Sequence, residues 1–275
     1  ALRLPRRIWP CRPLGSAAPD PPFEPALGST RTAPERSLRS SADPQPHPQD
    51  RMEFVYVVPR EKLFRDCYPQ GLVPFGSHAG GEPLEREVFE ASVVEHGFFV
   101  ERDYAERTPS LKQVIPYAVT VCNGEVLLLR RLAKGGEDRL HDKLSIGVGG
   151  HINPEDLADA AADSSSRPSG RNPIAAGSRR EITEELEVEG ATSLLSVGII
   201  NDDSNPVGAV HVGVVQVLSV EGKVDIRERD VLEGRLVPPT ELERMLGSGA
   251  NFETWSSMLV HRLADFLPQP LTALS

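Results

Sequence analysis

The segment 178-SRREITEELEVEG-190 most constrains the fold, because it places four carboxylates within seven residues, at Glu181, Glu184, Glu185 and Glu187. On a helix, the first three project from one face. Like charges at this spacing repel each other, so the cluster is unfavourable unless a cation lies against it. The sequence therefore predicts a helix with a positively charged group bound against its acidic face.

The same helix has a second face that favours burial. Ile174, Ser178, Ile182 and Leu186 recur every four residues, which predicts a stripe that packs against a sheet. We expect the helix to span residues 174–187, with Asn172 as its cap and Pro173 in its first turn. Its acidic face would then line a cleft, as an oxygen-only site of the kind that Mg²⁺ prefers.

Most other elements are predicted to be strands. Asn123-Gly124 lies between two apolar runs in residues 115–131, which is typical of a hairpin. Strands are expected at residues 53–60, 144–151, 192–200, 209–218 and 223–227. Helices are expected at residues 240–246, capped by Thr240, and at 252–267. Strands with single helices between and after them favour an α/β sandwich with a mixed sheet.

The first 51 residues differ in composition from the rest. They hold 11 of the 25 prolines and little apolar periodicity, so we expect a disordered Pro/Arg-rich tail over 1–51. A transit peptide is disfavoured by early prolines, and a true start at Met52 is the simpler alternative. One folded domain is expected over residues 52–275.

Charge and cysteine content exclude several classes of protein. The tail carries +3 and the whole chain −10, which leaves −13 on residues 52–275 and argues against nucleic-acid polymers as partners. No apolar run is long enough to cross a membrane. Cys11, Cys67 and Cys122 lack metal-ligand or redox spacing, so a reducing cytoplasm is expected.

Two segments together resemble the Nudix box. Residues 180–185, R-E-I-T-E-E, resemble the core of the family pattern G-x5-E-x7-R-E-U-x-E-E-x-G-U, in which U is aliphatic. Upstream, 147-GVGGHINPED-156 is similar to the start of the box, with Gly150 followed six residues later by Asp156. The segment G-V-G-G-H-I-N also resembles a subgroup of predicted MutT-like phosphoesterases with a lengthened box.

The chain departs from the family pattern in three places. Between Asp156 and Arg180 lie 23 residues where the pattern has seven, so about 16 are inserted. We expect residues 157–172 to form a surface loop. Asp156 replaces Glu, and Glu187 replaces the Gly that ends the helix, a role that Gly190 would take instead.

The resemblance implies a Nudix-type α/β/α sandwich that uses Mg²⁺ or Mn²⁺ to cleave a phosphoanhydride. The substrate would be a nucleoside diphosphate linked to another group, and Nudix proteins often form homodimers. Glu184 and Glu185 would be the principal metal ligands, and the Gly150 carbonyl would complete the set. Glu181 would be a ligand or general base, and Arg180 would orient a carboxylate.

Basic residues lie just before the glycine strand and are candidates for phosphate contact: Arg130, Arg131, Lys134, Arg139 and Lys143. A solvated basic loop is the equal alternative. His151 and Asp156 are further candidates for substrate contact.

Several residues have a structural and a functional interpretation. Asp202 and Asp203 are more typical of a plain turn than of an extra metal ligand. His211 on a strand is as consistent with a hydrogen-bonded sheet residue as with a site. For Trp255 and Cys122, core packing is the simplest account.

Two other functions compete with hydrolysis. A non-catalytic nucleotide-binding Nudix module is disfavoured, because all three metal carboxylates are present. An isoprenyl-diphosphate isomerase would need a Cys and a Glu, and Cys122 lies badly in the sequence for that role.

Overall fold

The computed structural model describes residues 11–12, 52–64, 67–77, 83–132, 143–162 and 172–267. The predictions for the tail, for Lys134 and for Arg139 lie outside these ranges. Within the described ranges, no helix combines the length and apolar character needed to cross a membrane.

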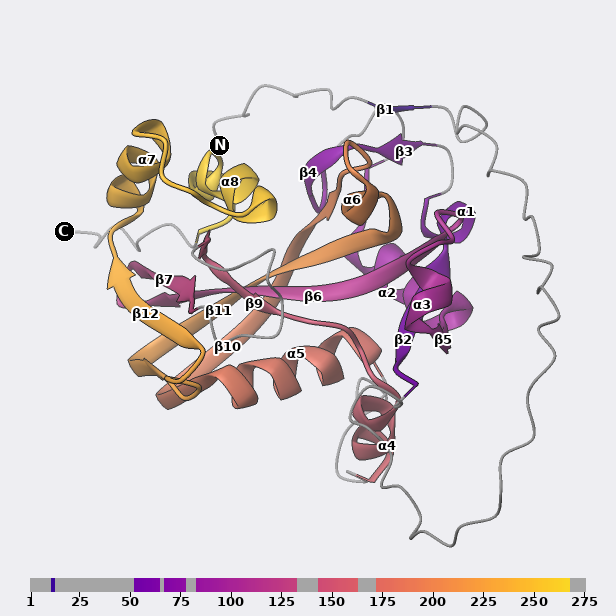
Figure 1. Cartoon of the computed structure of the whole chain (residues 1–275), viewed down its shortest axis with the longest axis horizontal. Coiled ribbons are helices and arrows are strands. Elements are labelled where there is room, and N and C mark those ends of the chain that lie inside the picture. The colour runs from indigo at the N-terminus through magenta and orange to yellow at the C-terminus, as the bar shows by residue number, and fades with distance from the viewer. Residues whose placement is uncertain are drawn as a thin grey trace, which may run out of the picture.

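A mixed sheet of ten strands forms the centre of the molecule (Figure 1). Its main path runs β12 (Leu232–Val237), β7 (Glu125–Arg131), β6 (Leu111–Cys122), β11 (His211–Ile226), β10 (Leu186–Asn201) and β4 (Gly71–Pro74). Off this path are β2 (Phe54–Pro59), β5 (Phe98–Glu101), β8 (Leu144–Ser145) and β9 (Gly147–Gly149). A separate pair joins β1 (Cys11–Arg12) to β3 (Tyr68–Pro69).

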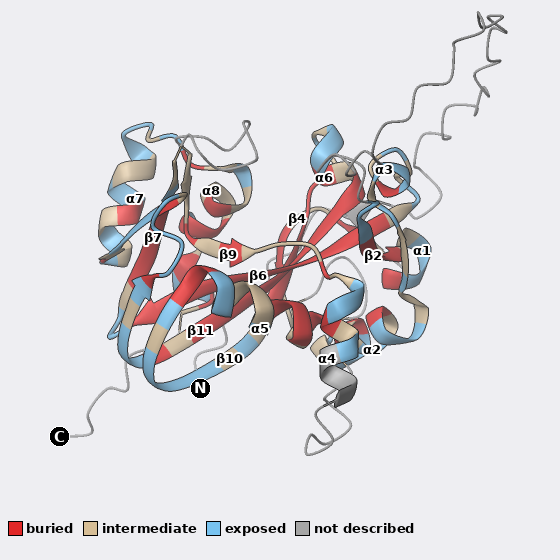
Figure 2. Ribbon diagram, turned by 60° about the horizontal axis from the view of Figure 1, so that its bottom comes forward, coloured by how far each residue is buried: buried red, intermediate tan, exposed pale blue. Residues whose placement is uncertain are grey.

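The core lies along β6 and β11, which pair in parallel while their other neighbours run antiparallel. Both strands are buried over nearly continuous apolar runs (Figure 2), as expected of strands covered on both faces. The predicted mixed sheet is therefore confirmed.

Helices cover both faces of this sheet. On β11, Val217 packs in the cluster that contains Leu242 of α7 (Pro239–Gly247). The next residue, Leu218, packs in the cluster with Ile182 of α5 (Pro173–Glu185). Because successive strand residues point to opposite faces, α5 lies on one face and α7 on the other, joined there by α8 (Thr254–Val260). The predicted sandwich is confirmed.

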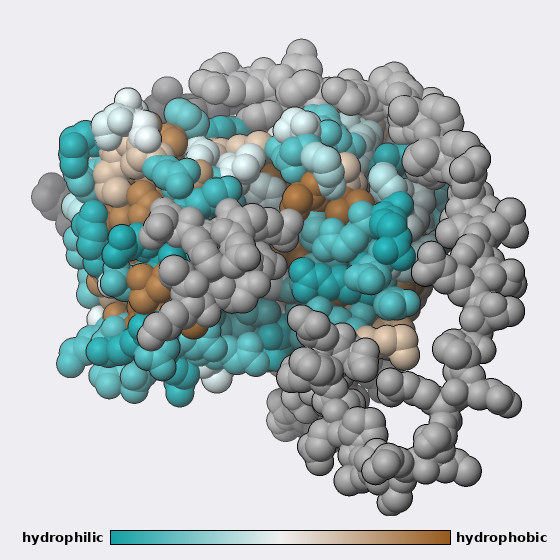
Figure 3. Space-filling model, in the orientation of Figure 1, coloured by the Kyte–Doolittle hydropathy of each residue, from teal (hydrophilic) through white to brown (hydrophobic). Residues whose placement is uncertain are grey.

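The remaining helical elements are α1 (Arg60–Leu63), α2 (Arg86–His96), α3 (Arg102–Ala105), α4 (Pro154–Ala162), α6 (Pro206–Val210) and the 3₁₀ turn Leu263–Asp265. Toward the lower edge of the view in Figure 3, where α5 and β10 lie, the surface is largely hydrophilic.

Several element boundaries were predicted wrongly. Residues 157–162 belong to α4, because their alanines and Leu157 favour a helix over a loop, and residues 163–171 lie outside the described ranges. Pro238, rather than Thr240, precedes α7, and the helix predicted over residues 252–267 ends at Val260. The strands predicted at 209–218 and 223–227 are one strand, β11, with α6 before it.

The predicted helix stop at Gly190 is also wrong. The helix α5 ends at Glu185, and Leu186 already has extended backbone. Gly190 pairs with Gly222 across β10 and β11. Its φ is +108°, and a Cβ there would lie 2.1 Å from the Glu221 carbonyl oxygen, so a glycine is needed for close strand approach. Glu187 consequently lies exposed on a strand, apart from the acidic helix face.

The cysteines and the last helix were assessed mainly as packing residues. Cys122 is free and buried, and Trp255 packs edge-on against Tyr117 with ring centroids 5.6 Å apart, which confirms core packing. Cys67 is disulfide-bonded, a feature that cysteine spacing did not predict.

Candidate active site

The helix α5 is fixed against the sheet by its apolar stripe. Ile174, Ser178 and Leu186 are each no more than 2% exposed, and Ile182 packs partly buried beside them. The Asn172 side chain accepts a hydrogen bond from the Ile174 amide at 3.0 Å, so the predicted cap is confirmed. The stripe and cap hold the helix in one rotation, which decides where its acidic face points.

The three carboxylates of the acidic face differ in burial. The side chain of Glu184 is 51% exposed, whereas those of Glu181 and Glu185 are 13% and 8% exposed. One oxygen of Glu185 lies 3.2 Å from Arg131, but its buried Oε2 has no hydrogen-bond partner among the described residues. A buried carboxylate oxygen without a partner is unfavourable, so this atom is a candidate for binding a cation.

The pKa values of buried Glu185 and partly buried Glu181 reflect their surroundings. Burial raises the pKa of Glu185 to about 7, partly opposed by Arg131 and assisted by the negative charge of Glu181. Burial also raises the pKa of Glu181, against the effect of Arg180. Two coupled carboxyls with raised pKa values on one helix face are typical of a functional site.

Arg180 lies at the centre of the acidic face. Its guanidinium donates to Asp156 Oδ1 at 2.8 Å, to Glu184 Oε2 at 2.9 Å and to the His151 carbonyl at 2.7 Å. Glu181 Oε1 lies 2.9 Å from the same group. Arg180 therefore connects the acidic helix face to the segment between β9 and α4.

Asp156 is placed to position Arg180. Its side chain is 2% exposed and also accepts a hydrogen bond from the Asn153 amide at 2.8 Å. Contact between Asp156 and substrate stays a prediction, but its oxygens are already engaged within the protein.

Gly150 lies directly against the acidic face. A Cβ at this position would be 2.1 Å from Glu181 Oε1. Any side chain here would therefore fill the space beside this partly buried carboxylate, and only glycine leaves that space for another group.

The basic residues before the glycine strand were expected in a loop, but two of them lie on a strand. Arg130 and Arg131 belong to β7. Arg130 pairs with Glu233 on β12 at 2.6 Å, away from α5, whereas Arg131 contacts the acidic face through Glu185. Lys143 lies partly buried just before β8. A phosphate contact by any of the three stays a prediction.

Comparison with known proteins identifies the family of this chain. No family model matches the sequence. The chain is similar to Protein YmaB of Bacillus subtilis (strain 168), with 36% identity over 214 residues that cover 76% of this chain and 96% of that protein. It is also similar to the solved structure of Tm1382, a candidate Nudix hydrolase. That match has a TM-score of 0.61 and 27% identity, and it covers 78% of this chain and 100% of the other. The chain belongs to the Nudix superfamily.

A more distant structure has the same family name. The NUDIX hydrolase from Alicyclobacillus acidocaldarius matches with a TM-score of 0.41 and 13% identity, over 55% of this chain and 90% of that one.

The donor set fits the divalent cation that Nudix hydrolases use. Glu181, Glu184, Glu185 and the Gly150 carbonyl offer only oxygen, which suits Mg²⁺ or Mn²⁺. The unpartnered Glu185 oxygen and the space left by Gly150 are both on the face where such an ion would bind.

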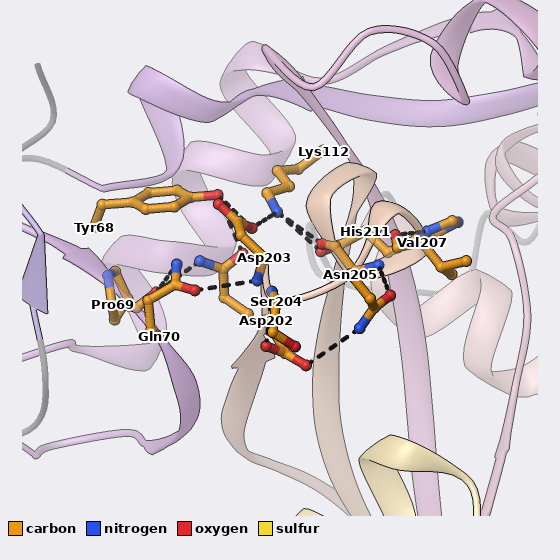
Figure 4. A network of polar contacts seen from close by, with 12 residues as sticks. Tyr68, Pro69, Gln70, Lys112, Asp202, Asp203, Ser204, Asn205, Val207 and His211 are labelled. Atoms are coloured by element: carbon orange, nitrogen blue, oxygen red, sulfur yellow. Dashed lines mark hydrogen bonds and ion pairs between the residues drawn. The ribbon is translucent and has the colours of Figure 1, made fainter. Parts of the chain in front are cut away.

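The two aspartates after β10 belong to a different region, which Figure 4 shows. Asp203 Oδ1 lies 2.6 Å from the Nζ atom of Lys112 on β6 and accepts from the Tyr68 hydroxyl at 3.1 Å. Asp202 accepts from the Ser204 amide at 3.1 Å. These contacts favour the interpretation as turn residues. Lys112, whose side chain is 0% exposed, was missed, because nothing in an apolar run marks one lysine as buried.

His151 and His211 lie together, although their positions in the sequence gave no sign of it. Their Nε2 atoms are 3.3 Å apart. The side chain of His151 therefore points toward β11, while its carbonyl faces Arg180.

Proposed function

We propose that this Nudix protein is a Mg²⁺- or Mn²⁺-dependent hydrolase that cleaves a phosphoanhydride bond in a small, nucleotide-derived diphosphate. The observation that carries the proposal is the buried Glu185 oxygen that has no partner among the described residues, on the same helix face as the partly buried Glu181. Nudix structural similarity supports the reaction class.

The carboxylates would divide their roles according to burial. Glu185 and Glu184 would hold the cation, with the Gly150 carbonyl as a further oxygen. When bound, the cation would neutralise the diphosphate and acidify an attacking water. Glu181, whose pKa is raised by burial, would hold or accept a proton.

Arg180 would keep these groups in place. It is bonded to Glu184, lies beside Glu181, and is itself held by Asp156 and the His151 carbonyl. Arg131 would limit the repulsion that Glu185 experiences until a cation binds. The arrangement thus keeps negative charge concentrated at one point of the surface.

The experiment is a hydrolysis assay on the full chain with Mg²⁺ or with a chelator. Nucleoside triphosphates, dinucleotides, nucleotide sugars and non-nucleotide diphosphates would be compared by phosphate release, after coupling to a pyrophosphatase and a phosphatase. Glu185→Gln keeps the shape but removes the charge. We expect it to lower metal-dependent turnover by at least about 100-fold, the scale for loss of a charge-stabilising group.

Glu187→Gln is the matched control, because Glu187 is exposed on β10, and it should keep wild-type turnover. An active Glu185→Gln protein, or turnover that persists with chelator, would contradict the proposal. Nucleotide binding without turnover of any substrate would instead favour a regulatory module.

A further inference from the structure

A second group of metal-ligand side chains lies beside the carboxylate site. Glu106 follows α3, His151 follows β9, and His211 begins β11. One ligand atom from each lies within 4.8 Å of the others. Three separate elements therefore bring two imidazoles and a carboxylate to one point.

The spacing of the two imidazoles matches metal ligands. Their Nε2 atoms are 3.3 Å apart, with ring planes inclined at 52°. Two nitrogens bound at 2.0 to 2.1 Å to a tetrahedral Zn²⁺ lie about 3.3 Å apart. The same 3.3 Å separation is also within reach of a hydrogen bond between the two rings, which is the alternative that the metal-binding experiment must separate.

The tautomer of His211 is fixed by the backbone. Its Nδ1 atom lies 2.6 Å from the Val207 carbonyl oxygen (Figure 4). A carbonyl oxygen only accepts, so Nδ1 carries the proton and Nε2 presents its lone pair toward His151. This is the arrangement found around metal-bound histidines, whose other nitrogen donates to a carbonyl or carboxylate.

His211 is also held rigidly. It is 5% exposed, and its own carbonyl lies 3.3 Å from Lys112 Nζ. The helix before it, α6, is capped by Asn205, which accepts from the Gly208 amide at 2.9 Å. A ligand that is ordered before binding loses little entropy when the metal arrives.

Glu106 supplies the negative charge of the group. Arg102 lies 3.6 Å from its carboxylate, but Arg102 also pairs with Glu53 at the shorter distance of 2.9 Å. Two imidazoles with one carboxylate suit Zn²⁺ and similar transition metals, whereas Mg²⁺ prefers an all-oxygen set. The ligand chemistry therefore differs from that of the acidic face on α5.

We infer that Glu106, His151 and His211 form a second cation site, specific for a transition metal of the Zn²⁺ class. Three protein ligands leave a fourth position open to water or to a substrate oxygen. The two sites adjoin along the chain, because Gly150 faces Glu181 while the next residue, His151, faces His211. The inference rests on ligand geometry and does not depend on the proposed hydrolysis.

Metal binding to the stripped, full-length protein tests this site directly. Zn²⁺ binding would be followed by calorimetry, and Co²⁺ binding by its visible absorption, with excess Mg²⁺ present to saturate the oxygen site. We expect one tightly bound Co²⁺ or Zn²⁺. His151→Ala and Glu106→Gln should each weaken that binding by about 100-fold or more, because loss of even an outer partner costs 10- to 100-fold.

Two controls separate this site from others. His261→Ala removes an exposed histidine outside the group and should bind like the wild type. Glu185→Gln should retain the Co²⁺ spectrum even if it loses turnover. Circular dichroism would verify folding, and Glu106→Gln provides a variant of unchanged shape at a partly buried position.

Three results would overturn the inference. One is absence of tight Zn²⁺ or Co²⁺ binding to the wild type. Another is undiminished binding in both His151→Ala and Glu106→Gln. The third is loss of the Co²⁺ spectrum in Glu185→Gln, which would place the ion at the acidic helix face. In the first two cases, the two imidazoles would simply share a hydrogen bond.

Discussion

Two regions of this molecule differ in how fully their buried charged groups are hydrogen-bonded within the protein. Around Lys112, the ammonium group contacts Asp203, the Gly208 carbonyl and the His211 carbonyl, so its donors are satisfied within the protein. On α5, the buried Glu185 carboxylate has one arginine contact, and its other oxygen has no partner in the part of the chain that the structure describes. The first group has its partners within the protein, and the second has an oxygen available to a ligand from outside.

The difference separates structural from functional polar groups. Burial lowers the pKa of Lys112 to about 8, with Asp203 opposing that shift, and the ion pair fixes the start of β11. Burial likewise raises the pKa of Glu185 to about 7, with Arg131 opposing that shift, so the two groups differ in their hydrogen-bond partners and not in the size of their pKa shifts. A cation bound at Glu185 would compensate for the charge of that carboxylate.

The largest expected effect on stability comes from removing the buried ammonium group of Lys112. Lys112→Met leaves Asp203 partly buried without its cation, so we expect a loss of about 3 to 5 kcal/mol in the free energy of unfolding. Urea denaturation would measure it. Lys112→Met combined with Asp203→Asn should recover most of this loss, because both charges are then absent.

The exposed Lys62→Met serves as the control, with an expected change within about 0.5 kcal/mol. If Lys112→Met were as mild as this control, the ion pair would not be the feature that stabilises this region.

The two regions also differ in how far the sequence predicted them. The α5 site follows from local spacing, because helical periodicity alone brings Glu181, Glu184 and Glu185 to one face and the apolar stripe to the other. The hairpin at Asn123-Gly124 is local in the same sense, and its φ values of +53° and +85° confirm the turn.

Contacts across the sheet could not be predicted in this way. Lys112 and Asp203 lie 91 residues apart, and His151 and His211 lie 60 apart. The pairs meet because β9, β6, β11 and β10 are neighbours in the sheet with a particular register. Without that register, a single lysine in an apolar run and two isolated histidines carry no signal of partnership.

A smaller effect, which stabilises the protein, is expected when the charge of Glu185 is removed. For metal-free protein, Glu185→Gln should raise the free energy of unfolding at pH 8 by about 2 to 3 kcal/mol, since it removes a carboxylate that is costly to ionise where it lies. Arg131, which is 31% exposed, can remain hydrated after its partner is neutralised.

The raised pKa of Glu185 determines how the effect of Glu185→Gln on the free energy of unfolding varies with pH. The pKa of Glu185 is about 7 in the folded state and 4.5 ordinarily, so the folded protein binds more protons between these values. The stabilisation from the protonated carboxyl is complete below pH 4.5 and is lost as pH rises through 7. The advantage of Glu185→Gln should therefore grow over this window. Mg²⁺ should stabilise the wild type more than the variant, and an equal response of both would show that Glu185 does not hold the ion.

The smallest effect compares the helix caps of the two regions. Asn172 caps α5 and Asn205 caps α6, each through a side-chain oxygen that accepts a backbone amide. Replacing either with alanine should cost about 1 kcal/mol in the free energy of unfolding, measured by urea denaturation.

The two cap substitutions should differ in their effect on metal binding. Asn205→Ala loosens the helix that carries Val207, the carbonyl partner of His211, and should weaken Zn²⁺ binding. The Asn172 cap is at the start of α5, three turns before Glu185, so Asn172→Ala should leave both cation affinities nearly unchanged, because loss of a cap frays only the first turn. Equal weakening of Zn²⁺ binding by both variants would mean that the two regions respond as one unit rather than as separate sites.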